Sequence, residues 1–151
     1  EQNRLRLQRI TSRYAHRAAQ ARSDAEGDAG FLAAFGRVQD EVLRPVMEDV
    51  GAQLRAAGYD FRIAAGGEEK MPAIELHVMI PDRGESKDTI RFFARKYEEK
   101  GWQVIGEIEL KGSPVELTRF NAGEPIARDV AEHLVVEAVE QMLAATGGRR
   151  R

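Results

Sequence analysis

The spacing of apolar side chains changes twice along this 151-residue chain, and that change constrains its fold more than any other feature. Over residues 29–57 and again over 124–145, apolar residues recur every three or four positions, which is the period of an amphipathic helix. Over residues 59–120 they alternate with polar residues, as in strands with one buried face. The pattern therefore predicts helices, then four or five consecutive strands, then a helix.

This order of elements predicts an α+β fold. Strands that follow one another through short turns run antiparallel, and helices on either side of such a meander pack on one face of the sheet. We expect a four- to five-stranded antiparallel sheet packed by a second helix, kinked at Pro45, and by a C-terminal helix with Pro125 at its first position. Gly58 should end the second helix. The expected buried row of the last helix is Ile126, Val130, Leu134, Ala138 and Met142.

Residues 88–97 fit two patterns. A strand would bury Ile90, Phe92 and Ala94, whereas a helix would bury Phe93 and leave Phe92 exposed. We favour the strand because it removes Phe92 from water and because Gly101 suits a hairpin with a glycine bulge.

The N-terminal segment predicts a separate helical arm. Residues 4–23 carry a thin apolar stripe that starts at Leu7, Ile10 and Tyr14 and continues in alanines. Two glycines and two aspartates within 24–30 predict a break before the next helix. We accordingly divide the chain into a basic helical arm (1–26), an α+β domain (27–147) and a basic flexible tail (148–151).

Charge is distributed unevenly between these parts. The formal net charge is −2, but six arginines and one glutamate give residues 1–23 a charge of +5. The last three arginines add +3, so residues 24–148 carry −10. The chain thus combines an acidic body with two basic ends.

The residues that usually carry catalysis or bind metals are scarce or scattered. The absence of cysteine rules out disulfides and thiolate chemistry, and neither of the common glycine-rich nucleotide-binding motifs occurs. The three histidines are far apart, and the acidic loop at Asp82, Glu85 and Asp88 lacks the ligand rhythm of a calcium loop. We therefore expect no catalytic set, no metal site and no cofactor.

The same sequence indicates where the protein should be found. No apolar run approaches the length of a membrane span, and the first residues contain no apolar signal-peptide region. We expect a cytoplasmic protein without a membrane partner. Its preference for arginine over lysine is typical of a GC-rich bacterial genome.

Two surfaces are candidates for binding. The apolar stripe of the arm and the outward face of the sheet could form an oligomer or partner interface, through Leu7, Ile10, Tyr14, Phe93, Tyr97 and Ile105. Arginines on the same two surfaces could contact an anion or a nucleic acid, namely Arg6, Arg9, Arg13, Arg17, Arg91 and Arg95.

These observations predict a non-enzymatic protein–protein interaction or adaptor module that forms a homodimer. The expected partner is another protein, above all a second copy of the chain. The first alternative is a nucleic-acid-binding protein that uses the arginine stripe of the arm and an open aromatic and basic sheet face. The second is a small-ligand binder or enzyme with a pocket between the sheet and the helices.

Overall fold

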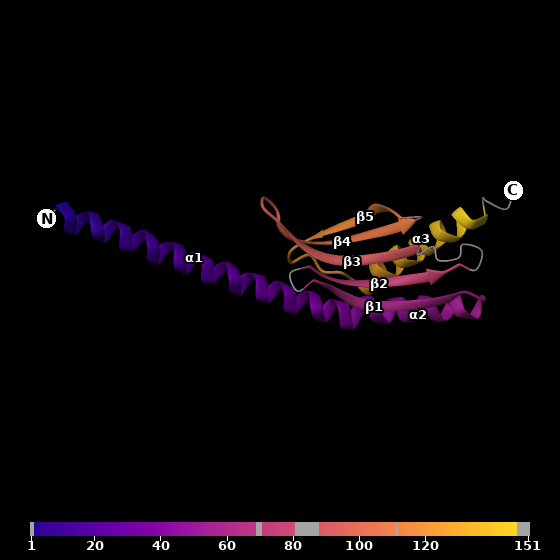
Figure 1. The fold of residues 1–151 in the computed structure, drawn as a ribbon. Helices are drawn as coiled ribbons and strands as arrows, with labels where there is room; N and C mark the ends of the chain where they lie inside the picture. The colour runs from indigo at the N-terminus through magenta and orange to yellow at the C-terminus, as the bar shows by residue number, and fades with distance from the viewer. Residues whose placement is uncertain (1, 69–70, 81–87, 111, 148–151) are drawn as a thin grey trace.

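The computed structural model describes residues 2–68, 71–80, 88–110 and 112–147, and it confirms the α+β fold (Figure 1). The elements follow in the order α1 (Gln2–Val38), a π-helical turn η1 (Gln39–Leu43), α2 (Arg44–Ala56), β1 (Asp60–Glu68), β2 (Met71–Met79), β3 (Asp88–Tyr97), β4 (Gly101–Leu110), β5 (Ser113–Asn121) and α3 (Arg128–Gly147). The predicted basic tail at 148–151 and most of the acidic loop before β3 lie outside the described residues.

The five strands form one antiparallel sheet in the order of the sequence, β1-β2-β3-β4-β5. Residues 88–97 form a strand, as favoured, and Ile90, Phe92 and Ala94 are fully buried on its inner side. β1 includes Gly66 and Gly67 and continues as far as Glu68. Between β4 and β5 the register shifts by one residue at Gly106 and Glu107, which is a β-bulge.

The first helix does not end where the sequence predicts a break. α1 continues through 24–30, so the predicted boundary between two helices is wrong. The two aspartates of this segment bind side chains instead of capping a new helix: Gln20 Nε2 donates to Asp24, and Trp102 Nε1 donates to Asp28. Glycines within a helix cost only about 0.5–1 kcal/mol each relative to alanine, which is too little to break it here.

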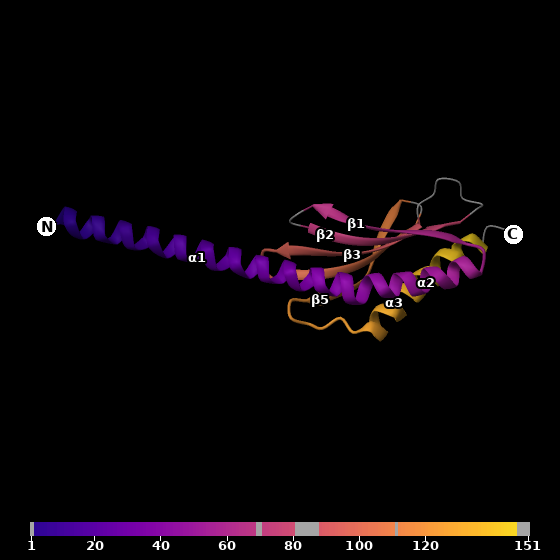
Figure 2. The same cartoon turned by 90° about the horizontal axis from the view of Figure 1, so that it is seen from below.

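The irregularity expected at Pro45 takes the form of a π-helical turn, η1, directly before the proline. The backbone N–H of Arg44 bonds to the carbonyl of Gln39, five residues back. Pro45 has no N–H and would crowd a carbonyl in a regular α-helix, so one wider turn accommodates it. The helix then continues as α2, so that α1, η1 and α2 form one long rod (Figure 2).

The predicted stop at Gly58 is confirmed. Gly58 has φ of 95°, a left-handed conformation that glycine adopts without steric cost. The N–H of Tyr59 bonds to the carbonyl of Leu54 at 2.9 Å, and that of Gly58 bonds to Arg55 at 3.0 Å. These two bonds are the Schellman arrangement, which turns the chain from α2 into β1.

The C-terminal helix begins later than predicted. α3 starts at Arg128, and Pro125 lies in the connection before it, after a turn in which the N–H of Glu124 bonds to Asn121. The buried face of the helix also differs from the predicted row. Val130 is 43% exposed, whereas Ala131 and Val135 are fully buried. The predicted row is therefore wrong at Val130, whereas Ile126, Ala138 and Met142 are buried as predicted and Leu134 is half-buried.

The helices α2 and α3 lie side by side on one face of the sheet and enclose the core with it (Figures 1 and 2). Packing is closest where Gly51 of α2 meets β1, because a Cβ atom there would lie 2.4 Å from the ring of Phe61. The largest fully buried side chains include Leu43, Met47, Ile74, Leu76, Ile90, Phe92, Ile108 and Met142. The opposite face of the sheet is left open, and the N-terminal part of α1 projects beyond the body.

Candidate interaction surfaces

The projecting part of α1, residues 2–27, is hereafter called the arm. All of its residues except Ala18 are exposed, and at 1.5 Å per residue it is about 39 Å long. Three large apolar side chains share one side of it: Leu7, Ile10 and Tyr14 are 62%, 56% and 76% exposed. The structure thus places the predicted apolar stripe on a helix without intramolecular cover.

The four predicted arginines of the arm lie on a stripe beside these apolar residues. Arg6, Arg9, Arg13 and Arg17 are exposed, and none of them forms an ion pair with another described residue. Their charges remain available to an external anion or to an acidic protein surface.

The arm meets the body at Asp28. Trp102 Nε1 and Lys96 Nζ each donate a hydrogen bond of 2.8 Å to Asp28 Oδ1, and the hydrogen bond from Lys96 raises the pKa of its amine. One turn further along α1, Phe31 stacks on Trp102 with ring centroids 5.0 Å apart. These contacts anchor the helix where it leaves the sheet.

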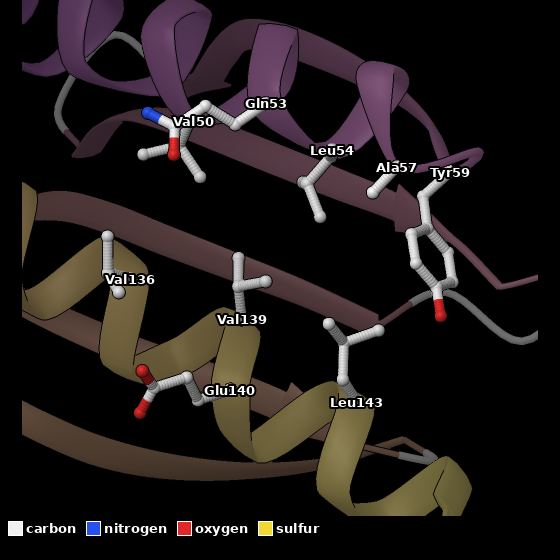
Figure 3. A pocket seen from close by; sticks show the side chains of 9 residues that line it. All are labelled: Val50, Gln53, Leu54, Ala57, Tyr59, Val136, Val139, Glu140 and Leu143. Atoms are coloured by element: carbon white, nitrogen blue, oxygen red, sulfur yellow. The ribbon is translucent and has the colours of Figure 1, made fainter.

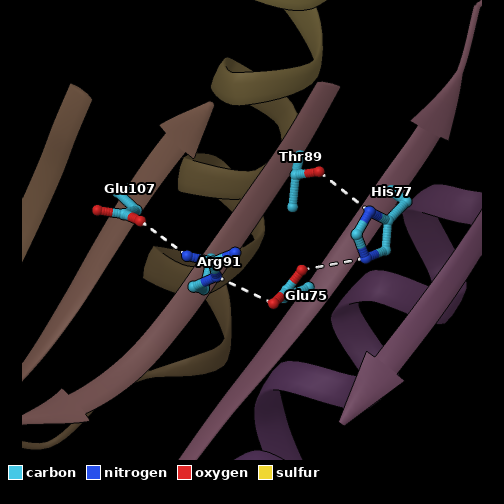
Figure 4. A network of polar contacts seen from close by, with 5 residues as sticks. All are labelled: Glu75, His77, Thr89, Arg91 and Glu107. Atoms are coloured by element: carbon cyan, nitrogen blue, oxygen red, sulfur yellow. Dashed lines mark hydrogen bonds and ion pairs between the residues drawn. The ribbon is translucent and has the colours of Figure 1, made fainter. Parts of the chain in front are cut away.

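The open sheet face carries a network of polar contacts across β2, β3 and β4 (Figure 4). Arg91 donates to Glu75 at 3.0 Å through Nε and to Glu107 at 3.2 Å through Nη1. On β2, His77 Nε2 lies 3.0 Å from Glu75, and its Nδ1 lies 3.0 Å from the hydroxyl of the buried Thr89. The guanidinium of Arg91 is thus already paired with two carboxylates of its own chain. This makes Arg91 a weaker candidate for contact with an external anion.

Histidine, glutamate and threonine side chains in contact invite comparison with a hydrolytic triad. The nucleophile of such a triad must reach a substrate, and Thr89 is only 2% exposed. We therefore interpret the network of Figure 4 as cross-strand stabilisation of the sheet.

The aromatic part of the same face is also occupied by its neighbours. The guanidinium groups of Arg95 and Arg119 lie 5.2 and 5.0 Å from the ring centroid of Tyr97. Arg119 also pairs with Glu116 at 2.6 Å, and this hydrogen bond lowers the pKa of that carboxyl. Arg95 is exposed, and its guanidinium stacks on the ring of Tyr97.

The apolar residues predicted on this face differ in accessibility. Ile105 is only 3% exposed and is buried by its own chain, whereas Phe93 is half-buried. A shallow hollow of about 330 Å³ lies beside Phe93. It is lined by Gly67, Met71, Ala73, Glu75, Arg91, Phe93, Arg95 and Glu107.

A third surface was not predicted from the sequence. An apolar groove of about 160 Å³ lies between the outer sides of α2 and α3 (Figure 3). Its residues are Val50, Gln53, Leu54, Ala57, Tyr59, Val136, Val139, Glu140 and Leu143. Val136 was not predicted to contribute to a surface, because it lies outside the row expected to be buried on the last helix. The signal for it was the spacing of Val136, Val139 and Leu143, which recur after three and four positions.

The described residues contain no group of three or more histidine, aspartate or glutamate side chains arranged to hold a metal ion. None of the helices, as far as the structure describes them, has the length and apolar character needed to cross a membrane. Comparison of the chain with known protein families, curated proteins and solved structures finds no match. The function must therefore be argued from the geometry.

Proposed function

We propose that this chain is a non-enzymatic interaction module whose arm binds another protein chain, above all a second copy of itself. One observation carries the proposal: Leu7, Ile10 and Tyr14 are exposed on one side of a helix that projects from a well-packed body. Helices in water gain most of their stability from the packing of an apolar face, and the arm has no such packing within its own chain.

Covering the three large apolar side chains of this stripe should contribute substantially to the free energy of association. Burying a leucine or isoleucine side chain contributes about 1.5–3 kcal/mol, so three large side chains are enough for a measurable association. Helix-in-groove recognition uses residues at this spacing of three and four as anchors. A catalytic role has no comparable support in the structure, since the polar network of the sheet face is internally paired.

The proposal is tested by sedimentation velocity of the whole chain across the micromolar range. We expect concentration-dependent self-association, and we expect its loss when Leu7, Ile10 and Tyr14 are all changed to serine. Each lost anchor should weaken the complex about tenfold or more. A chain that stays monomeric at all concentrations, or a triple variant that associates like the wild type, would refute the proposal.

Nucleic-acid binding is a second candidate, and the exposed arginines of the arm favour it. The sheet face adds little to it, because Arg91 is held by two carboxylates. If the arm follows a phosphate backbone, fluorescence anisotropy with a random-sequence DNA oligonucleotide should show binding that weakens steeply between 50 and 200 mM salt. A variant with Arg9 and Arg13 changed to glutamate should then lose binding. Absence of binding at low salt excludes this candidate.

A further inference from the structure

The groove between α2 and α3 is an apolar surface that an amphipathic helix could fill. It is walled by Val50 and Leu54 on one side and by Val136 and Leu143 on the other, and the two helices run in the same direction along it (Figure 3). We propose that the arm of one copy docks into this groove of a second copy, and that the exchange is reciprocal. This inference rests on the proposed function, because it names the surface that receives the arm.

The arm cannot reach the groove of its own chain. The helix is continuous from Gln2 to Ala56, and the arm points away from the body along the same axis (Figure 1). Folding back would require breaking this helix and the contacts of Asp28 with Trp102. The docked arm must therefore come from another molecule.

The stripe and the groove have the same length. Leu7 and Tyr14 are seven residues apart, which is about 10.5 Å along a helix. The helical walls of the groove have the same span, because Val50 and Ala57 are seven residues apart, and so are Val136 and Leu143. The three large apolar residues of the arm therefore span the same length as the two helical walls of the groove.

Charge favours the groove over a second arm. The α3 wall is acidic, with Asp129, Glu132 and Glu140 at spacings that place them on the same side as Val136, and its Arg128 is paired with Asp49 at 2.6 Å. The arm carries its arginine stripe beside its apolar stripe. Two arms packed together would bring two copies of residues 1–23, each of charge +5, into contact, whereas residues 24–148 carry −10.

Matched variants of similar exposure test the docking. Ile10→Ser removes an anchor, and Leu5→Ser is its control because Leu5 is equally exposed at 56% but lies on the other side of the arm. Val136→Glu places a charge in the groove, and Val130→Glu is its control, since the two valines are 37% and 43% exposed and only Val136 lines the groove. Sedimentation velocity should show self-association weakened about tenfold or more by Ile10→Ser and Val136→Glu. Both controls should associate like the wild type.

A charge exchange tests the pairing directly. Variant A carries Arg6→Glu and Arg13→Glu, and variant B carries Glu132→Arg and Glu140→Arg, all at exposed positions. We expect each variant alone to associate weakly and their mixture to form a complex, because the acidic arm then meets a basic groove. These exposed changes also provide the test should Val136→Glu fail to fold, which circular dichroism would show.

The outcomes separate this inference from the proposed function. If Ile10→Ser weakens association but Val136→Glu and variant B do not, the arm is an interaction element and the groove is not its receptor. A photo-crosslinker at Tyr14 that captures a second arm instead of α2 or α3 would overturn the inference in the same way. A whole chain that is monomeric throughout would overturn both.

Discussion

The arm and the body of this molecule share one helix, yet they bury it to opposite extents. In α2 the side chains of Val46, Met47 and Leu54 are buried, whereas in the arm those of Leu7, Ile10 and Tyr14 lie in water. The helical period of apolar residues is present in both parts. Periodicity therefore shows which side of a helix can be covered, and only the tertiary structure shows whether its own chain covers it.

The comparison also extends to polar groups. In the body, Arg91 is held between two carboxylates and Arg119 between a glutamate and an aromatic ring. In the arm, Arg9 and Arg13 form no ion pair with any residue that the structure describes. These arginines of the body are thus paired within the chain, whereas the two arginines of the arm are exposed.

The largest expected difference in stability between the body and the arm concerns the removal of an aromatic side chain. Phe92→Ala leaves a cavity at the centre of the core and should lower the free energy of unfolding by about 3–5 kcal/mol. Tyr14→Ala should change it by less than about 0.5 kcal/mol in the monomer. Denaturant unfolding followed by the fluorescence of Trp102, the single tryptophan, measures both. Similar losses for the two variants would mean that the arm packs on its own body.

A glycine in the body should respond to substitution with a clear loss. Gly51→Ala forces a methyl group against the ring of Phe61, 2.4 Å from its Cβ position, so either the ring or α2 must move. We expect a loss of about 1–3 kcal/mol in the free energy of unfolding. Phe61→Leu in the same chain should recover part of it by vacating the ring position, and a neutral Gly51→Ala would show that α2 and β1 are packed less closely.

A glycine-to-alanine substitution in or next to the arm should instead stabilise the helix. An added Cβ at Gly27 or Gly30 meets no atom within 4 Å, and alanine is the better helix former by about 0.5–1 kcal/mol at each position. Hydrogen exchange of the amides around 24–30 should slow accordingly in Gly27→Ala and Gly30→Ala. Unchanged or faster exchange would show that this segment is not an uninterrupted helix in solution.

The sequence predicted those parts of the fold and of the candidate surfaces that depend on contacts between residues close together in the chain. The alternation over residues 59–120 predicted strands with one buried face, on which Ile74, Leu76 and Val78 lie. The need to bury Phe92 decided the assignment of β3. The helix break at 24–30 failed because Asp28 bonds to Trp102, which lies 74 residues further along the chain. The α2–α3 groove and the pairing of Arg91 likewise depend on elements that are distant in sequence, so composition and spacing could not reveal them.

The smallest expected effect on stability concerns the contact between Asp28 and Lys96, where the arm meets the body. Because the hydrogen bond to Asp28 raises the pKa of Lys96 above its usual value of 10.5, the folded state favours the protonated amine. The resulting stabilisation is fully present below the pKa of the unfolded chain and is lost as pH rises through the higher pKa of the folded chain. Asp28→Asn keeps an acceptor for the indole of Trp102 but removes the charge. The difference in stability between wild type and Asp28→Asn should therefore shrink between about pH 10 and 12 when denaturant unfolding is compared at each pH. A difference that is constant across this range would show that Lys96 does not couple the arm to the body.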